Sequence, residues 1–123
     1  MEKIYENFRI LICKDYDDVS IAAADIITAQ IAAKPDSVLG MATGSTPVGT
    51  YAHLIELHKA GKADFAGITS FNLDEYYPIS RENDQSYHYF MHEKLFNHVN
   101  INPANINIPD GAAASAALAP RSR

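Results

Sequence analysis

Two glycines and several hydroxyl groups interrupt an apolar stretch in the first half of the sequence. Residues 39–51 read LGMATGSTPVGTY, in which a strand-like segment gives way to helical spacing at the four residues Thr43, Gly44, Ser45 and Thr46. A strand that turns directly into a helix presents backbone N–H groups and hydroxyls at the helix N-terminus, which is where anions bind. Gly44 permits the tight turn, and Pro47 suits the first helical turn because its missing N–H costs nothing there.

This stretch has two interpretations that its residues alone leave open. It lacks the third glycine of the dinucleotide fingerprint and the Gly-Lys of a Walker loop, so nucleotide binding is disfavoured. It could hold a single phosphate group, or Ser45 or Thr46 could simply cap the helix. A second motif has to decide between these interpretations.

Residues 70–78, SFNLDEYYP, supply the second motif. Asp74 and Glu75 directly follow an apolar run, so both are expected at the carboxyl end of a strand, where open α/β sheets bind ligands. If this strand neighbours the strand before Gly44, the carboxylates lie beside that loop. A base there could remove a proton from a carbon next to a carbonyl, with Glu75 and Tyr76 in support. The plainer alternative is that Asp74 caps the following turn and Glu75 is solvated.

Five histidines raise the question of a metal site. His88 and His92 stand four apart on one face of an expected helix, but no Glu follows His88 as the zinc pattern H-E-x-x-H requires. No cysteine or further ligand cluster accompanies the pair. The sequence therefore predicts no metal site, and these histidines are interpreted as surface or partly buried side chains.

The elements before the second motif follow from apolar spacing. Residues 8–13 are predicted to form a strand, and the polar stretch after them can cap a helix over 19–34. That helix should have one apolar face, formed by Val19, Ala22, Ala23, Ile26, Ala29 and Ala33. Residues 37–42 are apolar at odd and even positions alike, which predicts a strand covered on both faces in a parallel sheet.

The rest of the chain continues this alternation. A second helix, closed by Gly61, is predicted from the apolar positions Val48, Tyr51, Leu54, Ile55 and Leu57. Next come a strand over 68–73, a polar loop over 78–86, a helix over 86–99 and a short extended piece over 105–109. Alternating strands and helices argue for right-handed βαβ units. The predicted fold class is α/β, an open parallel, Rossmann-like sheet with flanking helices.

Composition argues against several kinds of partner. The chain has 123 residues and a formal net charge of −5, and its Lys and Arg are scattered, which argues against nucleic-acid binding. No apolar run approaches the roughly 18 residues of a membrane span. Cys13 is the single cysteine, which excludes an intrachain disulfide, and no signal peptide is evident. We expect a cytoplasmic protein with one domain over 1–111 and an Ala-rich, disordered or foreign tail over 112–123.

Three segments together resemble the glucosamine-6-phosphate deaminase family. They are LGMATGSTPVGTY, LIELHKAGKADFAGITSFNLDEYY and DQSYHYFMHEKLFNHVNINPANINIPDG, which cover residues 39–111 almost continuously. The resemblance implies conversion of glucosamine 6-phosphate and water into fructose 6-phosphate and ammonia, without a metal or organic cofactor. It implies that Asp74 removes the proton from carbon 2 and that the sugar phosphate is held by Thr43, Gly44, Ser45 and Thr46. It also implies a homo-oligomer for the full-length form.

The chain departs from this family in length. Family members are longer, and their second half carries an Asp, His and Glu group for ring opening together with basic residues of the phosphate site, so the chain resembles an N-terminal half. Half of a parallel sheet should leave an unpaired edge and an uncovered apolar face. Turnover by this chain alone is therefore a separate question. Two alternatives stay open, a 6-phosphogluconolactonase-like enzyme and a non-catalytic sugar-phosphate-binding fragment.

Overall fold

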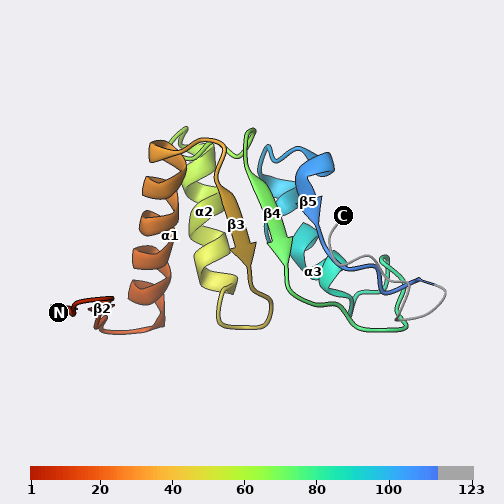
Figure 1. The fold of residues 1–123 in the computed structure, drawn as a ribbon, viewed down its shortest axis with the longest axis horizontal. Helices are drawn as coiled ribbons and strands as arrows, with labels where there is room; N and C mark the ends of the chain where they lie inside the picture. Colours follow the sequence, from red (N-terminus) through yellow and green to blue (C-terminus); the bar gives the residue numbers. More distant parts are fainter. Residues whose placement is uncertain (114–123) are drawn as a thin grey trace.

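The computed structural model describes residues 1–113, and Figure 1 shows a sheet flanked by helices. The elements are, in order, β1 (Glu2–Ile4), β2 (Arg9–Leu11), α1 (Tyr16–Ala33), β3 (Val38–Met41), α2 (Val48–Lys59), β4 (Thr69–Asn72), α3 (Tyr87–Lys94), the 3-10 turns Phe96–His98 and Pro103–Asn105, and β5 (Ile106–Asn107). The predicted tail over 112–123 lies outside the described residues from position 114 onward. No helix within residues 1–113 is long and apolar enough to cross a membrane.

Strands β3, β4 and β5 form one parallel sheet in that order. Met41 on β3 lies opposite Asn72 on β4, and Ser70 on β4 lies opposite Ile106 on β5. Because the strands are parallel, their carboxyl ends meet at one edge of the sheet, and the loops after β3 and β4 emerge there. This arrangement confirms the predicted open α/β sheet with flanking helices.

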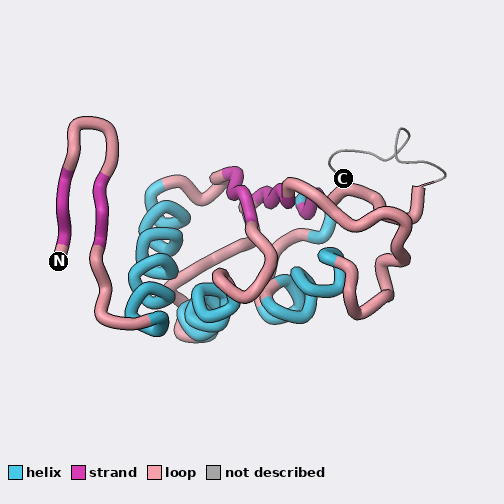
Figure 2. Tube along the Cα trace, turned by 90° about the horizontal axis from the view of Figure 1, so that it is seen from below, coloured by secondary structure: helices cyan, strands magenta, loops and turns pink. Residues whose placement is uncertain are grey.

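Helices α2 and α3 lie on one side of the sheet (Figure 2). Buried apolar side chains from the sheet, the helices and the connecting segments form the core: Met41, Tyr51, Leu54, Phe65, Ile68, Met91, Leu95 and Ile108. Burial alternates along β4, where Ser70 and Asn72 are buried and Phe71 is exposed. This alternation is typical of a strand that is covered on one face only.

The opposite face of the sheet is open among the described residues. Val38 on β3 is 63% exposed, and Phe71 on β4 is 37% exposed. Strand β3 is also an edge strand, because β4 is its one neighbour within residues 1–113. The prediction that residues 37–42 are covered on both faces is therefore wrong for this chain. The expected unpaired edge and uncovered apolar face are both present.

The N-terminal strand does not join this sheet. Strand β2 pairs antiparallel with β1, through a turn in which the Tyr5 amide donates to the Phe8 carbonyl at 2.7 Å. The hairpin leaves Phe8 and Ile12 more than half exposed. Residues 8–13 are predicted to begin a βαβ unit, and this prediction is wrong. Only Arg9–Leu11 is a strand, and its partner is the segment next to it in sequence.

Helix α1 lies close to its predicted position, but it buries a different face. Asp15 caps the helix by accepting a hydrogen bond from the Asp18 amide at 2.8 Å. Val19 and Ile26 belong to the predicted apolar face, yet they are 48% and 51% exposed. The buried side chains are Ser20, Ala24 and Ile31. Apolar residues surround most of this helix, so their spacing fits more than one face and the prediction selected the wrong one.

The third predicted helix, over 86–99, is shorter in the structure. Ser86 caps α3 by accepting a hydrogen bond from the Tyr89 amide at 2.9 Å. The helix ends at Lys94, because Leu95 has a φ of −145° that leaves helical geometry. A 3-10 turn, Phe96–His98, takes the place of the last predicted turn.

Candidate functional site

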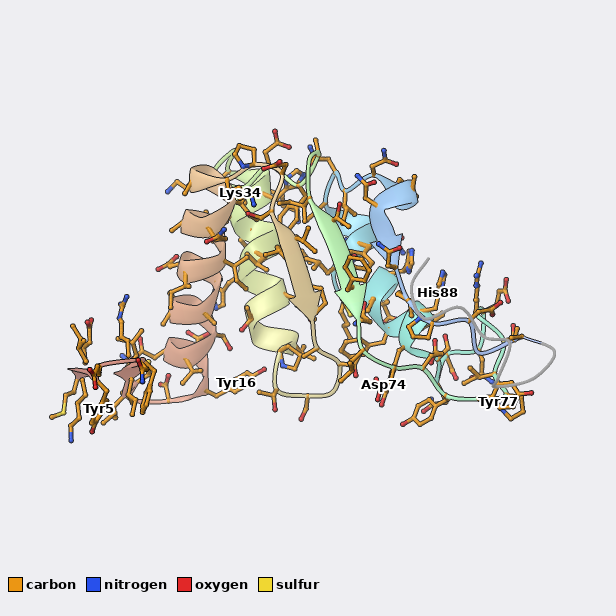
Figure 3. All side chains as sticks on the ribbon, viewed as in Figure 1. Tyr5, Tyr16, Lys34, Asp74, Tyr77 and His88 are labelled. Carbon is orange, nitrogen blue, oxygen red and sulfur yellow. The ribbon has the colours of Figure 1, made fainter. Side chains whose placement is uncertain are left out.

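Two loops that carry the predicted motifs meet at the carboxyl edge of the sheet. Residues 42–47 link β3 to α2, and residues 73–86 link β4 to α3. The buried Asn72 side chain joins the two strand ends, because its Nδ2 donates to the Met41 carbonyl at 3.0 Å. Figure 3 shows Asp74 at the same end of the sheet as the loop that follows β3. The structure thus brings the two motifs to one edge.

The β3–α2 loop, residues 42–47, turns at Gly44 directly before the start of α2. Gly44 has a φ of +94°, a conformation that residues with a side chain rarely adopt. Thr43 is half-buried, whereas Ser45 and Thr46 are exposed just before α2. Pro47 occupies the cap position of α2, and this described helix has no side-chain cap. The alternative that Ser45 or Thr46 caps the helix is therefore not supported, and their hydroxyls are available to a ligand.

The Tyr16 side chain holds this loop from the start of α1. Its hydroxyl lies 3.0 Å from the carbonyl oxygens of both Ser45 and Thr46. It also accepts a hydrogen bond from the Gly49 amide at 2.8 Å. Figure 3 shows this side chain extending from the start of α1 toward the start of α2. No sequence motif points to Tyr16, because its partners lie about thirty positions further along the chain.

Tyr51 holds the other end of the same loop. Its hydroxyl donates to the Ala42 carbonyl, at the end of β3. Burial raises the pKa of Tyr51 to about 12, so its phenol stays protonated and able to donate. The apolar spacing of α2 correctly predicts that Tyr51 is buried, but it gives no sign of this hydrogen bond.

Asp74 follows β4 and is exposed to solvent. The neighbouring Leu73 is 94% exposed, so this end of the strand is uncovered within the described chain. The backbone amides of the following segment donate to Glu75, which leaves the alternative of a capping Asp74 without support. An exposed carboxylate at the sheet edge that also carries residues 42–47 suits a base acting on a bound ligand.

The Glu75 carboxylate accepts hydrogen bonds from backbone amides of its own segment and of the start of α3. Its Oε1 accepts hydrogen bonds from the amides of Tyr76 and Tyr87 at 2.9 and 2.8 Å, and its Oε2 accepts one from the His88 amide at 2.9 Å. A carboxylate is stabilised there by the unpaired N–H groups of the helix end. The alternative of a solvated Glu75 is therefore wrong. Glu75 thus fixes the segment between β4 and α3.

Tyr76 lies on the surface of the same segment. Its hydroxyl is 3.4 Å from that of Tyr87, and this contact is the main cause that raises the pKa of Tyr76.

Gly111 lies against the backbone of the segment between β4 and α3, although no sequence motif points to it. A Cβ on Gly111 would lie 2.3 Å from the Tyr76 carbonyl oxygen and 3.1 Å from Cγ of Glu75. The Gly111 carbonyl also accepts a hydrogen bond from the Ile79 amide at 2.8 Å. Gly111, near the end of the described residues, thus helps to hold the segment between β4 and α3 in place.

His88 and His92 stack with their ring centres 4.2 Å apart. Nδ1 of His92 lies 2.8 Å from the His88 carbonyl oxygen, so this nitrogen already takes part in a hydrogen bond. Burial is the main cause that lowers the pKa of His88, and the neighbouring His92 adds to it. Within residues 1–113, no group of three or more His, Cys, Asp and Glu side chains is placed to hold a metal ion.

Comparison of the sequence with known proteins identifies relatives of this chain. No protein-family model matches the chain. The glucosamine-6-phosphate deaminase of Clostridioides difficile is 57% identical over 105 residues, which are 85% of this chain and 42% of the relative. That of Halothermothrix orenii is 54% identical over the same share of the chain and 44% of the relative. The chain thus spans less than half the length of the curated relatives that it matches.

Solved structures with a similar fold include a protein of the same name as these relatives. A monomeric glucosamine-6-phosphate deaminase has a TM-score of 0.81 and 44% identity, over 84% of this chain and 43% of that one. A 6-phosphogluconolactonase from Plasmodium vivax has a TM-score of 0.73 and 29% identity, over 92% of this chain and 40% of that one. The identity to the lactonase is lower, and the deaminases match the chain in both sequence and fold. Over the segment that they share, the chain is thus similar in both sequence and fold to glucosamine-6-phosphate deaminases.

Proposed function

We propose that the chain carries the phosphate loop and the catalytic base of a glucosamine-6-phosphate deaminase, which converts glucosamine 6-phosphate and water into fructose 6-phosphate and ammonia. The observation that carries this proposal is the juxtaposition of the uncapped β3–α2 loop and the free carboxylate of Asp74 at one edge of the sheet. The 57% identity to a deaminase supports it. We place the protein in the cytoplasm, and a full-length form is expected to self-associate.

The β3–α2 loop binds the phosphate group in this proposal. The N-terminus of α2 carries a partial positive charge, which favours an anion. The bare Gly44 lets the backbone approach the phosphate oxygens closely. The hydroxyls of Thr43, Ser45 and Thr46 add further donors. The phosphate is thereby held by the loop, and the sugar extends from it across the sheet edge.

Asp74 then acts on carbon 2 of the open-chain sugar. A phosphate held at one end positions the reacting carbon over the carboxylate, which raises the rate by fixing distance and orientation. Asp74 takes the proton from carbon 2 and returns it to carbon 1. The nitrogen then departs as ammonia after water attacks the resulting imine at carbon 2. Glu75 keeps the base in place through its hydrogen bonds from the Tyr76 amide and from the Tyr87 and His88 amides at the start of α3.

Exchange of the carbon 2 proton is the step that tests this role of Asp74. The chain is incubated with glucosamine 6-phosphate in D2O, and loss of the carbon 2 proton signal is followed by NMR. We expect exchange above a buffer blank, with a loss of at least about 100-fold in Asp74→Asn, a size typical of removing a general base. Asp25→Asn, the same change at an exposed position on α1, is the matched control. Equal exchange by Asp74→Asn and the unmodified chain would contradict the role of Asp74.

Release of ammonia is a more demanding test than exchange. Spontaneous ring opening supplies some open-chain sugar to Asp74, whereas complete turnover in the relatives takes place in proteins more than twice as long as the matched segment. We therefore place phosphate binding and proton exchange in this chain and leave full deamination to the whole protein.

A second candidate function is hydrolysis of a phosphorylated sugar lactone. The fold shared with a 6-phosphogluconolactonase, at a TM-score of 0.73 and 29% identity, favours it. Lactone hydrolysis uses the phosphate loop but needs no proton removal from carbon 2. Hydrolysis of 6-phosphogluconolactone that persists in Asp74→Asn would favour this candidate over the deaminase.

A further inference from the structure

We propose that the Tyr16 hydroxyl is a positioning group that sets the conformation of the β3–α2 loop for anion binding. The inference rests on the proposed function of that loop and adds a residue from a different element. Tyr16 begins α1 and precedes the first residue of the loop by more than twenty positions. It makes no contact with the substrate in this proposal and acts through the loop backbone.

The Tyr16 hydroxyl has three backbone partners, two in the β3–α2 loop and one in the first turn of α2. It accepts a hydrogen bond from the Gly49 amide at 2.8 Å and has the carbonyl oxygens of Ser45 and Thr46 each at 3.0 Å. A hydroxyl has one proton, so it donates to one of the two carbonyls at a time. Gly49 lies in the first turn of α2, where amides lack an intrahelical acceptor. Tyr16 thus satisfies one of these amides and fixes the carbonyls that precede them.

The orientation of the Ser45 carbonyl decides where the next amide points. In a trans peptide unit the C=O and the N–H point in opposite directions. Because the Ser45 carbonyl faces the Tyr16 hydroxyl, the Thr46 N–H of the same peptide unit points away from it. Tyr16 therefore aims a donor of the loop at the side where an anion can bind. Without the hydroxyl, the Ser45 carbonyl keeps only the longer hydrogen bond from the Val48 amide, at 3.4 Å, and this peptide unit is held less firmly.

The chain makes room for this contact at Gly49. A Cβ there would lie 2.3 Å from Oγ of Ser20 and 2.8 Å from Cε2 of Tyr16. Both atoms belong to α1, and Ser20 is buried. A side chain at position 49 would therefore force Ser20 and Tyr16 to shift. The bare backbone of Gly49 and the ring of Tyr16 form one fitted contact.

Tyr16→Phe removes the hydroxyl and keeps the ring. We expect hydrogen exchange of the Gly49 amide to rise about tenfold, which corresponds to the loss of one hydrogen bond. We expect the Kd for glucosamine 6-phosphate, measured by NMR titration, to rise about 3- to 10-fold. Tyr5→Phe, the same change on the exposed hairpin, is the matched control and should leave both values unchanged.

A general loss of stability has to be separated from a local effect on the loop. Ile27→Val trims a partly buried side chain on the same helix and lowers the Tm without touching the hydroxyl. If Ile27→Val weakens sugar-phosphate binding as much as Tyr16→Phe does, the positioning role is overturned. An unchanged Kd in Tyr16→Phe overturns it as well.

Failure of the proposed function would give a different pattern. If the unmodified chain binds no sugar phosphate, the proposed function fails, and the titration no longer reports on Tyr16. The exchange rate of the Gly49 amide then decides. A rise confined to residues 45–49 in Tyr16→Phe supports the hold on the loop, and an unchanged rate overturns it.

Discussion

The two loops at the carboxyl edge of the sheet differ in how firmly hydrogen bonds hold them in place. The β3–α2 loop is short and is held at both ends by tyrosine hydroxyls, from Tyr16 and Tyr51. The β4–α3 segment, residues 73–86, is longer and is fixed mainly at Glu75, while Asp74 and Leu73 are exposed. The proposed phosphate loop is thus held by side chains of the described residues, whereas the proposed catalytic carboxylate of Asp74 is exposed.

This difference between the two loops implies that the chain can bind an anion more readily than it can turn over a substrate. A loop whose donors are fixed by its own chain can hold an anion without further cover. A carboxylate in open solvent gains little from its surroundings, because water screens its charge and competes for its proton. The comparison therefore predicts that binding survives changes near Asp74, and that changes in the core remove both functions together.

Loss of core packing should have the largest effect, because it acts on both loops. Phe65 is fully buried between α2 and β4, and its ring packs edge-on against His58. We expect Phe65→Ala to lower the free energy of unfolding by about 3–5 kcal/mol in urea titrations. Phe8→Ala, on the exposed hairpin, should cost less than about 0.5 kcal/mol. Sugar-phosphate binding that persists unchanged in Phe65→Ala would show that the loops do not depend on this core.

Removing the Glu75 carboxylate should loosen only the β4–α3 segment. Glu75→Ala leaves three backbone amides without their acceptor. We expect a loss of about 1.5–3 kcal/mol in urea titrations, because hydrogen bonds to a charged group are stronger than neutral ones. The Kd for inorganic phosphate should stay unchanged, since the β3–α2 loop is not altered. Glu56→Ala, at an exposed site on α2, is the control. A weakened phosphate Kd in Glu75→Ala would mean that the two loops are coupled.

Substitution of Gly44 should affect only the β3–α2 loop. Gly44 has a φ of +94°, and an alanine there costs about 1–2 kcal/mol. We expect Gly44→Ala to weaken phosphate binding while hydrogen exchange of the His88 amide on α3 stays the same. Gly40→Ala is the matched control, because a Cβ at Gly40 meets nothing within 4 Å. Wild-type phosphate affinity in Gly44→Ala would contradict the role of this loop.

The smallest expected effect is a pH dependence on the α3 side. Burial lowers the pKa of His88 from its ordinary 6.5, so the folded state favours the neutral imidazole. The unfolded chain then binds more protons, and stability falls as pH drops from about 6.5 through the folded pKa. We expect urea midpoints to decrease between pH 7.5 and 5.5, and His88→Gln to flatten this dependence. His98→Gln, at an exposed histidine, should retain it. An equal slope in His88→Gln would assign the dependence to other groups.

Local patterns were sufficient to predict the part of the fold that carries the site. Strands β3 and β4 and helix α2 lie where apolar spacing predicts them, and the glycine and hydroxyl residues between β3 and α2 predict the loop. The parallel order of the strands then follows from the alternation of strands and helices. These features depend on residues that are neighbours in sequence, which is why they can be read without a structure.

The features that sequence could not predict depend on contacts between distant residues. Apolar side chains surround α1, so their spacing could not show that Ser20 rather than Val19 is buried. The pairing of β2 with β1 removes it from the sheet, and no periodicity signals that choice. Tyr16, Glu75 and Gly111 act through backbone groups of other segments. Such contacts have no signature in residue spacing.

Thermal unfolding with and without glucosamine 6-phosphate tests the central claim most directly. A ligand that binds only the folded state raises its stability, by about 1.4 kcal/mol at ten times Kd, which corresponds to a Tm increase of several degrees. We predict a cooperative transition by circular dichroism that millimolar glucosamine 6-phosphate shifts upward, that glucosamine without phosphate leaves in place, and that responds less in Gly44→Ala. A transition that the sugar phosphate does not move would contradict a phosphate site at residues 42–47.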